Sequence, residues 1–333
     1  MTRQHFIYLA LFVLTAVLFS LPVNLVTVMD ESIGCARYPY PPPHSMISYC
    51  HTKIIADHDF GVFYYNTVPE MIENLRQADV VIMGNSRTQY AFSTKTTDRY
   101  FTDKGLKYFL FGLGDGEASK FALLIMQRYN IRPKVMIINA DPFFSDYMSD
   151  KAAEIVGESP MSKIRFWTRV VALNIMYPVC RTVPTACQPA LPVVYRSTVN
   201  GQWTQEPISP DMRVPLNPIA FPVNPDRVKA AAKIGRSFFS ALGLDPQCTV
   251  LNGIPGPSTD EDSMPYANST GFAEALSKTL GTKFIKVSLD KMDTLEGVHF
   301  NAETAEKYSA GLVSHLDSIL DACLSKNASA PHP

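Results

Sequence analysis

Three residue types that support nucleophilic catalysis follow strand-like segments of the chain. Ser86 comes shortly after the apolar run 80–83, and His299 lies three residues after Glu296, beyond the last such run. A serine hydroxyl is a weak nucleophile until a base takes its proton, and a carboxylate commonly orients that base. The residues therefore predict Ser86 as nucleophile, His299 as base and Glu296 as the orienting acid, with Asp293 as the alternative acid.

The same chemistry needs hydrogen-bond donors for the negative charge that develops on the attacked carbonyl oxygen. Gly114 lies in a glycine-rich segment, Asn139 ends another apolar run, and Arg87 directly follows Ser86. We take Gly114 and Asn139 as candidate oxyanion donors and Arg87 as a candidate contact for an anionic substrate group. Simpler interpretations are that Ser86 caps a helix, as serine often does, and that Gly112 and Gly114 serve only a turn.

Five short apolar runs are typical of parallel strands that are covered on both faces, because each is too short for a helix and largely continuous. They span residues 78–84, 106–114, 133–141, 247–254 and 282–288. Helical patterns occur at 117–130, at 225–243 and from the N-cap Asn301 along one apolar stripe to Cys323. This alternation predicts a three-layer α/β/α domain with a doubly wound, mainly parallel sheet. Ligands of such sheets bind beyond the carboxyl ends of the strands, where the candidate residues lie.

The chain divides into several regions by composition. Residues 1–29 are an apolar leader, and the Pro- and Tyr-rich residues 30–55 indicate a juxtamembrane linker within a lead-in that runs to residue 74. The α/β domain covers 75–325, with a tail at 326–333 that we expect to be disordered. Residues 143–224 interrupt the alternation and contain a candidate helix at 162–176. We expect this insertion to form a lid or a partner surface, because a long loop in a compact domain is usually functional or mobile.

The leader favours a transmembrane anchor. Residues 6–29 carry no charged side chain and follow Arg3, and at 1.5 Å per residue they are long enough to cross a bilayer. The positive charge before them predicts a cytoplasmic N-terminus and a single span. We therefore expect a bacterial inner-membrane protein whose folded domain is periplasmic or extracellular. A cleaved signal peptide is the alternative, although its apolar core is usually shorter.

Cysteine usage agrees with export. The chain has six cysteines and no C-x-x-C pair, so disulfides are more consistent with this spacing than a zinc or thioredoxin-type site. Free, buried cysteines are the alternative. Proximity along the chain favours the pairs Cys35–Cys50 and Cys180–Cys187, and it leaves Cys248 with Cys323.

Charge argues against a nucleic-acid partner. The chain has 30 Lys and Arg against 31 Asp and Glu, without the basic excess of nucleic-acid-binding proteins. No P-loop or G-x-G-x-x-G follows the first apolar run, which disfavours a flavodoxin-like nucleotide binder. The serine chemistry implies neither a metal nor an organic cofactor.

Three segments, in order, resemble conserved blocks of the SGNH (GDSL-type) hydrolase superfamily. They are VVIMGNSR at 80–87, FGLGDGEAS at 111–119 and EGVHFNAETAEKYSAGL at 296–312. The resemblance covers 75–325 except the insertion, and it implies an SGNH/flavodoxin-like fold. By the same resemblance Ser86 is the nucleophile, Gly114 the oxyanion glycine, His299 the base and Glu296 the acid.

The chain departs from that pattern after the third strand. The usual G-x-N-D is replaced by Asn139-Ala140-Asp141, so Asp141 falls where an asparagine donor is expected. An ionised carboxylate cannot donate a hydrogen bond. Either Asn139 takes this role, or backbone groups form the oxyanion hole alone, or activity is weak or lost.

The anchored variant with G-N-S-R and a late H-x-N is also similar to exported members of the superfamily that work on cell-surface polymers. This resemblance implies a membrane-anchored esterase or O-acyltransferase that moves acyl groups, such as acetyl, on a polysaccharide through an acyl-Ser86 intermediate. It also implies a membrane-bound O-acyltransferase as a possible partner. The alternative is a catalytically decayed subunit that binds polysaccharide or that partner.

Overall fold

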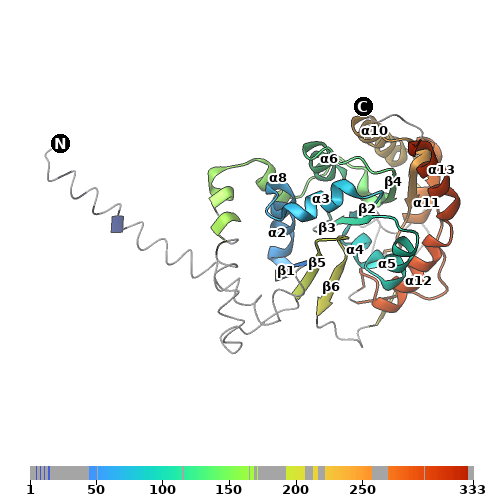
Figure 1. Cartoon of the computed structure of the whole chain (residues 1–333), viewed down its shortest axis with the longest axis horizontal. Helices are drawn as coiled ribbons and strands as arrows, with labels where there is room; N and C mark the ends of the chain where they lie inside the picture. The colour runs from blue at the N-terminus through green and yellow to red at the C-terminus, as the bar shows by residue number, and fades with distance from the viewer. Residues whose placement is uncertain are drawn as a thin grey trace.

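The computed structural model describes most of the chain from residue 45 to residue 328 (Figure 1). Within that range it leaves out 51, 115, 165, 169–170, 172–192, 207–212, 217–221, 257–268 and 296. Near the N-terminus it describes only residues 5, 8, 11, 14 and 15.

A five-stranded sheet with the order β3-β2-β4-β8-β9 forms the centre of the domain, and all four strand pairings are parallel. Its strands are β2 (Val80–Asn85), β3 (Tyr108–Leu113), β4 (Val135–Asn139), β8 (Thr249–Asn252) and β9 (Lys283–Phe284). All five predicted strands are therefore present and parallel. The last is shorter than the predicted 282–288 and lies at the edge of the sheet.

Side chains of the sheet alternate between two apolar cores. Val81 and Met83 belong to one core, whereas Val80 and Ile82 belong to the other, as the two-residue period of a strand requires. The first core is covered by α2 (Thr52–Tyr65), α3 (Pro69–Gln77), α6 (Ser119–Arg128), α10 (Pro225–Leu242) and α11 (Ser269–Leu280). The second is covered by α4 (Ser86–Phe92), α5 (Lys95–Asp103), α12 (Ala302–Val313) and α13 (Asp317–Ala328). The predicted three-layer α/β/α architecture is confirmed (Figure 1).

The predicted single C-terminal helix is wrong. Asn301 caps α12 as expected, since its Oδ1 accepts a hydrogen bond from Thr304 N at 2.9 Å. The helix then ends at Val313, and α13 begins at Asp317. In the turn between them, the N–H groups of His315 and Leu316 donate to carbonyls three residues back rather than four, which tightens the last turn. Residues 326–328 of the expected tail are helical, because α13 extends to residue 328, and 329–333 lie outside the described residues.

The insertion and the lead-in form a second sheet. β1 (Met46–Cys50) pairs antiparallel with β5 (Val193–Ser197), and β5 pairs with β6 (Trp203–Glu206). The linker predicted at 30–55 is therefore wrong at its end, because its backbone pairs with a strand far along the chain. The insertion also contains α8 (Asp150–Val156) and β7 (Val214–Pro215), and α7 (Ala140–Phe143) leads into it. β7 pairs antiparallel with β10 (Asp293–Thr294), which lies shortly before His299. Of the helix predicted at 162–176, residues 162–164 and 166–168 are helical, and most of the rest lies outside the described residues.

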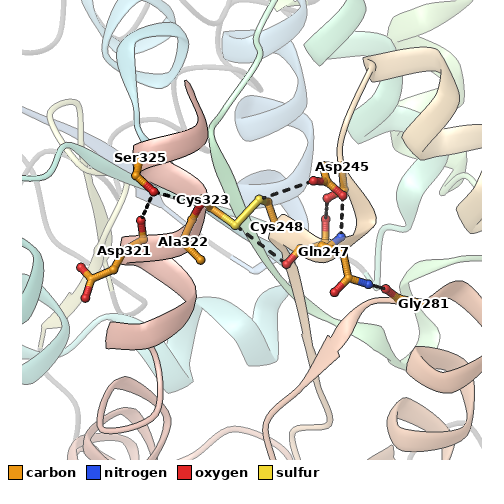
Figure 2. The surroundings of a disulfide bond; sticks show 9 residues. Asp245, Gln247, Cys248, Gly281, Asp321, Ala322, Cys323 and Ser325 are labelled. Carbon is orange, nitrogen blue, oxygen red and sulfur yellow. Dashed lines mark hydrogen bonds between the residues drawn. A yellow bond between two sulfur atoms is a disulfide. The ribbon is translucent and has the colours of Figure 1, made fainter. Parts of the chain in front are cut away.

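The sulfur atoms of Cys248 and Cys323 form a disulfide, as predicted (Figure 2). It joins α13 to the short 3-10 helix η2 (Pro246–Cys248) that precedes β8. Of the other predicted pairs, Cys35, Cys180, Cys187 and the side chain of Cys50 lie outside the described residues.

The anchor predicted at 6–29 is described only at Tyr8, Leu11, Leu14 and Thr15. Among the residues that the structure describes, no helix has the length and apolar character needed to cross a membrane.

Candidate active site

Ser86 is the first residue of α4, directly after β2. The residue that caps this helix is Asn85, whose Oδ1 accepts a hydrogen bond from Arg87 N at 3.1 Å. The alternative in which Ser86 is the cap is therefore wrong. Ser86 is half-buried, and its hydroxyl remains available for another partner.

The sharp turn before Ser86 depends on Gly84. A Cβ at this position would lie 2.0 Å from Thr88 Oγ1 and 3.2 Å from Asn139 Cβ. Both distances are shorter than normal van der Waals contact. The close approach of α4 to the end of β2 therefore requires a glycine at position 84.

The structure brings Ser86 and His299 together, although 213 residues separate them in sequence. His299 Nε2 lies 2.9 Å from Ser86 Oγ, within hydrogen-bonding distance. A small closed loop holds the histidine. Thr294 and Phe300 form an antiparallel bridge, and Leu295 N donates to His299 O at 2.8 Å.

Tyr90 completes the surroundings of the histidine. Its ring stacks on the imidazole of His299, with centroids 4.3 Å apart and planes inclined by 29°. Tyr90 lies four residues after Ser86 on α4, so both side chains project from one face of the helix. Tyr90 is not among the site residues predicted from the sequence, although an aromatic residue at this helical spacing from the candidate serine was a signal for it.

Of the two candidate acids, Glu296 and Asp293, the structure describes only Asp293. Glu296, the first choice, lies outside the described residues. Asp293 is buried, and its Oδ2 pairs with Lys291 Nζ at 3.2 Å. Its backbone anchors the start of α12 through Thr304 and Asn301. These contacts hold the end of β10, and none of the described contacts of Asp293 is with His299.

Gly114 lies beside the nucleophile. Asn85 and Leu113 are register partners in β2 and β3, so Ser86 and Gly114 leave neighbouring strands at the same sheet edge. Gly114 O accepts a hydrogen bond from Glu117 N at 3.1 Å, which closes a tight turn. Asp115, inside this turn, lies outside the described residues.

Buried Glu117, which is not among the residues predicted from the sequence, joins that turn to the insertion. Its Oε2 accepts hydrogen bonds from Ser149 N at 3.0 Å and from Ser149 Oγ at 2.8 Å. Ser149 caps α8. A buried carboxylate that accepts several hydrogen bonds holds its partners firmly in place.

Asn139 and Arg87 together hold the loop after β8. Asn139 Oδ1 accepts from Ile254 N at 3.1 Å, and Arg87 Nη1 donates to Ile254 O at 2.8 Å. Both side chains are buried, with exposures of 1% and 3%. Arg87 therefore supports the loop from inside the protein instead of facing an anionic substrate group. Asn139 Nδ2 is also covered, and it has no hydrogen-bond partner among the described residues. The side chain of Asp141 is not described.

A buried ion pair between Arg196 and Asp59 lies next to the glycine-rich segment and supports it. Arg196 Nη1 lies 3.5 Å from Asp59 Oδ1, and both side chains are fully buried. Arg196 Nη2 also donates to Gly112 O, while Gly112 N donates to Gln89 Oε1 at 3.2 Å. The insertion and α4 thus fix this glycine from two sides.

Among the described residues, no group of three histidine, cysteine or acidic side chains is arranged to hold a metal ion. Comparison with protein-family models, with curated proteins and with solved structures finds no significant match to this chain. The chemical interpretation of the site therefore depends on its own geometry.

Proposed function

We propose that the chain is a serine-dependent carboxylic ester hydrolase or O-acyltransferase. The observation that carries this proposal is the 2.9 Å separation of Ser86 Oγ and His299 Nε2. This distance is within the range expected of a nucleophile and its general base. The pair lies beyond the carboxyl end of a parallel sheet, where α/β proteins place their ligand sites.

In the proposed reaction His299 Nε2 starts unprotonated and removes the proton of Ser86 Oγ. The oxygen forms a bond to the acyl carbon, and the bond from that carbon to the alcohol oxygen breaks. His299 returns the proton to the departing alcohol, which leaves an acyl-Ser86 ester. Water or a sugar hydroxyl then attacks this ester by the same proton exchange, and Ser86 is regenerated.

The negative oxygen of each tetrahedral intermediate needs hydrogen-bond donors. We assign this role to the backbone N–H groups around Gly114, since this turn neighbours Ser86 and is fixed through Glu117. Asn139 is a weaker candidate because its amide nitrogen is covered. Glu296 remains our proposed orienting acid on sequence grounds.

The proposed substrate is an acyl group, such as acetyl, on a cell-surface or secreted polysaccharide. The Cys248–Cys323 disulfide supports an oxidising compartment, and the apolar segment 6–29 supports attachment to the membrane. A membrane-bound O-acyltransferase partner is part of this proposal. It would supply the acyl group if the acceptor is a sugar.

The covered Asn139 and the acidic Asp141 favour a second candidate function. A site without a side-chain oxyanion donor suits a catalytically decayed subunit, which would bind polysaccharide or the membrane-bound partner without turning over an ester.

Turnover of p-nitrophenyl acetate by the full chain decides between these functions. Ser86→Ala and His299→Ala are each expected to reduce turnover roughly 10³-fold or more, whereas the remote exposed Ser325→Ala leaves it unchanged. A folded wild-type chain with no turnover of the ester would favour the binding subunit. Equal turnover in wild type and both dyad variants would contradict the assignment of Ser86.

A further inference from the structure

A cavity of about 380 Å³ lies beside the proposed dyad. Its volume is within the range of small-ligand sites, about 300–1,000 Å³. Its walls include Tyr90, whose ring stacks on His299, and Leu295 and Phe300 from the loop that holds His299. Ser86 and His299 are not among its lining residues. The cavity therefore shares Tyr90 and the loop of Leu295 and Phe300 with the surroundings of His299.

Three segments far apart in the sequence form the walls, and hydrogen bonds join them. The segment between α4 and α5 contacts the insertion, because Trp203 N donates to Ser93 Oγ at 2.7 Å and Gln202 Nε2 donates to Thr94 O at 2.9 Å. The same segment contacts α12 through Lys95 N, which donates to Glu306 Oε1 at 2.8 Å. These bonds indicate a preformed cavity rather than an accidental gap.

The lining suits a polyhydroxylated ring. Tyr90, Trp203, Leu295 and Phe300 provide apolar and aromatic surface for the C–H groups of a sugar. Hydrogen-bonding groups occur at the rim, including exposed Thr204 and Lys95.

Charge in the cavity disfavours anionic sugars. Asp98 and Glu306 supply two carboxylates against the single ammonium group of Lys95. Burial pushes the pKa of Glu306 upward, but hydrogen bonds from Thr96 and from the backbone of Lys95 outweigh this effect and lower it. Glu306 is therefore ionised at neutral pH, and a uronate or phosphate would meet excess negative charge.

We propose that this cavity binds one uncharged sugar unit of the polysaccharide, adjacent to the unit that carries the reacting acyl group. Since His299 is not a lining residue and Tyr90 belongs to both places, a sugar in the cavity would leave His299 Nε2 to the next unit of the same polymer. This inference rests on the proposed function for the identity of its polymer, but sugar binding is measurable without catalysis.

Intrinsic fluorescence provides the test, because Trp167 and Trp203 are the two tryptophans of the chain. In a Trp167→Phe background of the full chain, Trp203 in the cavity wall is the only reporter. The protein is kept in a polyoxyethylene detergent, which has no sugar headgroup to compete. The probes are maltotriose, cellotriose and chitotriose, with trigalacturonate as the anionic comparison at low salt.

At least one neutral trisaccharide is expected to give a saturable change in Trp203 fluorescence. Trigalacturonate is expected to bind at least ~10-fold more weakly, a factor that corresponds to about 1.4 kcal/mol. Thr204→Arg places a bulky side chain at the exposed rim and is expected to weaken binding at least ~10-fold by the same measure. Val199→Arg is the matched control in the preceding turn, where the side chain is 56% exposed, and it retains binding.

Three results would overturn the inference: no saturable change with any neutral probe, equal binding by the Thr204→Arg variant, or tighter binding of trigalacturonate. Ser86→Ala separates the two proposals, because it removes the nucleophile and leaves the cavity walls intact. Saturable sugar binding without ester turnover would refute the chemistry and support the cavity. Ester turnover without sugar binding would support the chemistry and refute the role of the cavity.

Discussion

The ring of Tyr90 lies against the imidazole of His299, at a centroid distance of 4.3 Å. Tyr90 also meets Trp203 of the insertion in an edge-to-face contact, with ring centroids 6.0 Å apart. One helix, α4, therefore carries both the proposed nucleophile and the ring that restrains the proposed base. Through Trp203, the insertion supports the position of His299.

We expect Tyr90→Leu to lower the turnover of p-nitrophenyl acetate about 3- to 10-fold, because an aromatic pair contributes roughly 0.5–1.5 kcal/mol. Tyr90→Phe keeps the stack and is expected to retain near wild-type turnover. The pH profile of kcat for the two variants is the informative measurement, since loss of orientation changes its height and preserves its shape. Equal rates in Tyr90→Leu and wild type would show that the stack does not position His299.

Gly84→Ala is expected to destabilise the fold by about 1–3 kcal/mol, the usual cost of inserting a methyl group into a packed site. The new Cβ would lie 2.0 Å from Thr88 Oγ1. Urea unfolding followed by circular dichroism measures the change. Adding Thr88→Ala to this variant removes the closest clash and is expected to restore part of the loss. A Gly84→Ala chain as stable as wild type would contradict the close approach of α4 to β2.

The Glu306 carboxylate is expected to stabilise the fold in a pH-dependent manner. Hydrogen bonds from Lys95 N and Thr96 N lower its pKa in the folded chain. The folded state therefore releases this proton more readily, and the stabilisation is fully present above the usual glutamate pKa of about 4.3. It is lost as the pH falls through the lower, folded-state pKa.

Glu306→Gln is accordingly expected to cost about 1–2 kcal/mol of unfolding free energy at pH 7, a typical value for hydrogen bonds to a charged group. The difference from wild type should shrink below pH ~4. Chemical unfolding at a series of pH values measures it, with the exposed Glu154→Gln as control. A difference that stayed constant from pH 7 to pH 3 would show that the ionised carboxylate is not responsible.

The disulfide between Cys248 and Cys323 closes a loop of 75 residues. Restriction of the unfolded chain predicts a stabilisation of about 4–5 kcal/mol. We expect the Cys248→Ser/Cys323→Ser variant to unfold at correspondingly lower urea concentration, and wild type with reductant to behave similarly. A reduced wild type that unfolds at the same midpoint as the oxidised chain would contradict this expectation.

Local patterns were sufficient to predict the central sheet, because continuous apolar runs identify strands that are covered on both faces. They also predicted the convergence of Ser86 and His299, since both follow strands whose carboxyl ends share one edge. Cys248 and Cys323 were paired correctly by elimination along the chain.

Long-range and side-chain effects were not predictable in the same way. The pairing of β1 with β5 joins residues 46–50 to residues 193–197, and nothing local in either segment indicates its partner. The break after Val313 interrupts a continuous apolar stripe. Arg87 looked available to a substrate because its neighbour is the candidate nucleophile, but its side chain turns inward to Ile254.

The separation of Ser86 and His299 by 213 positions along the chain also fixes the order in which the two residues are synthesised. Chains are synthesised from the N-terminus, so the nucleophile emerges long before its base. A nascent or truncated chain that ends before residue 299 contains Ser86 but lacks His299, the proposed proton acceptor. The proposed chemistry can therefore begin only once nearly the whole domain has been made and folded.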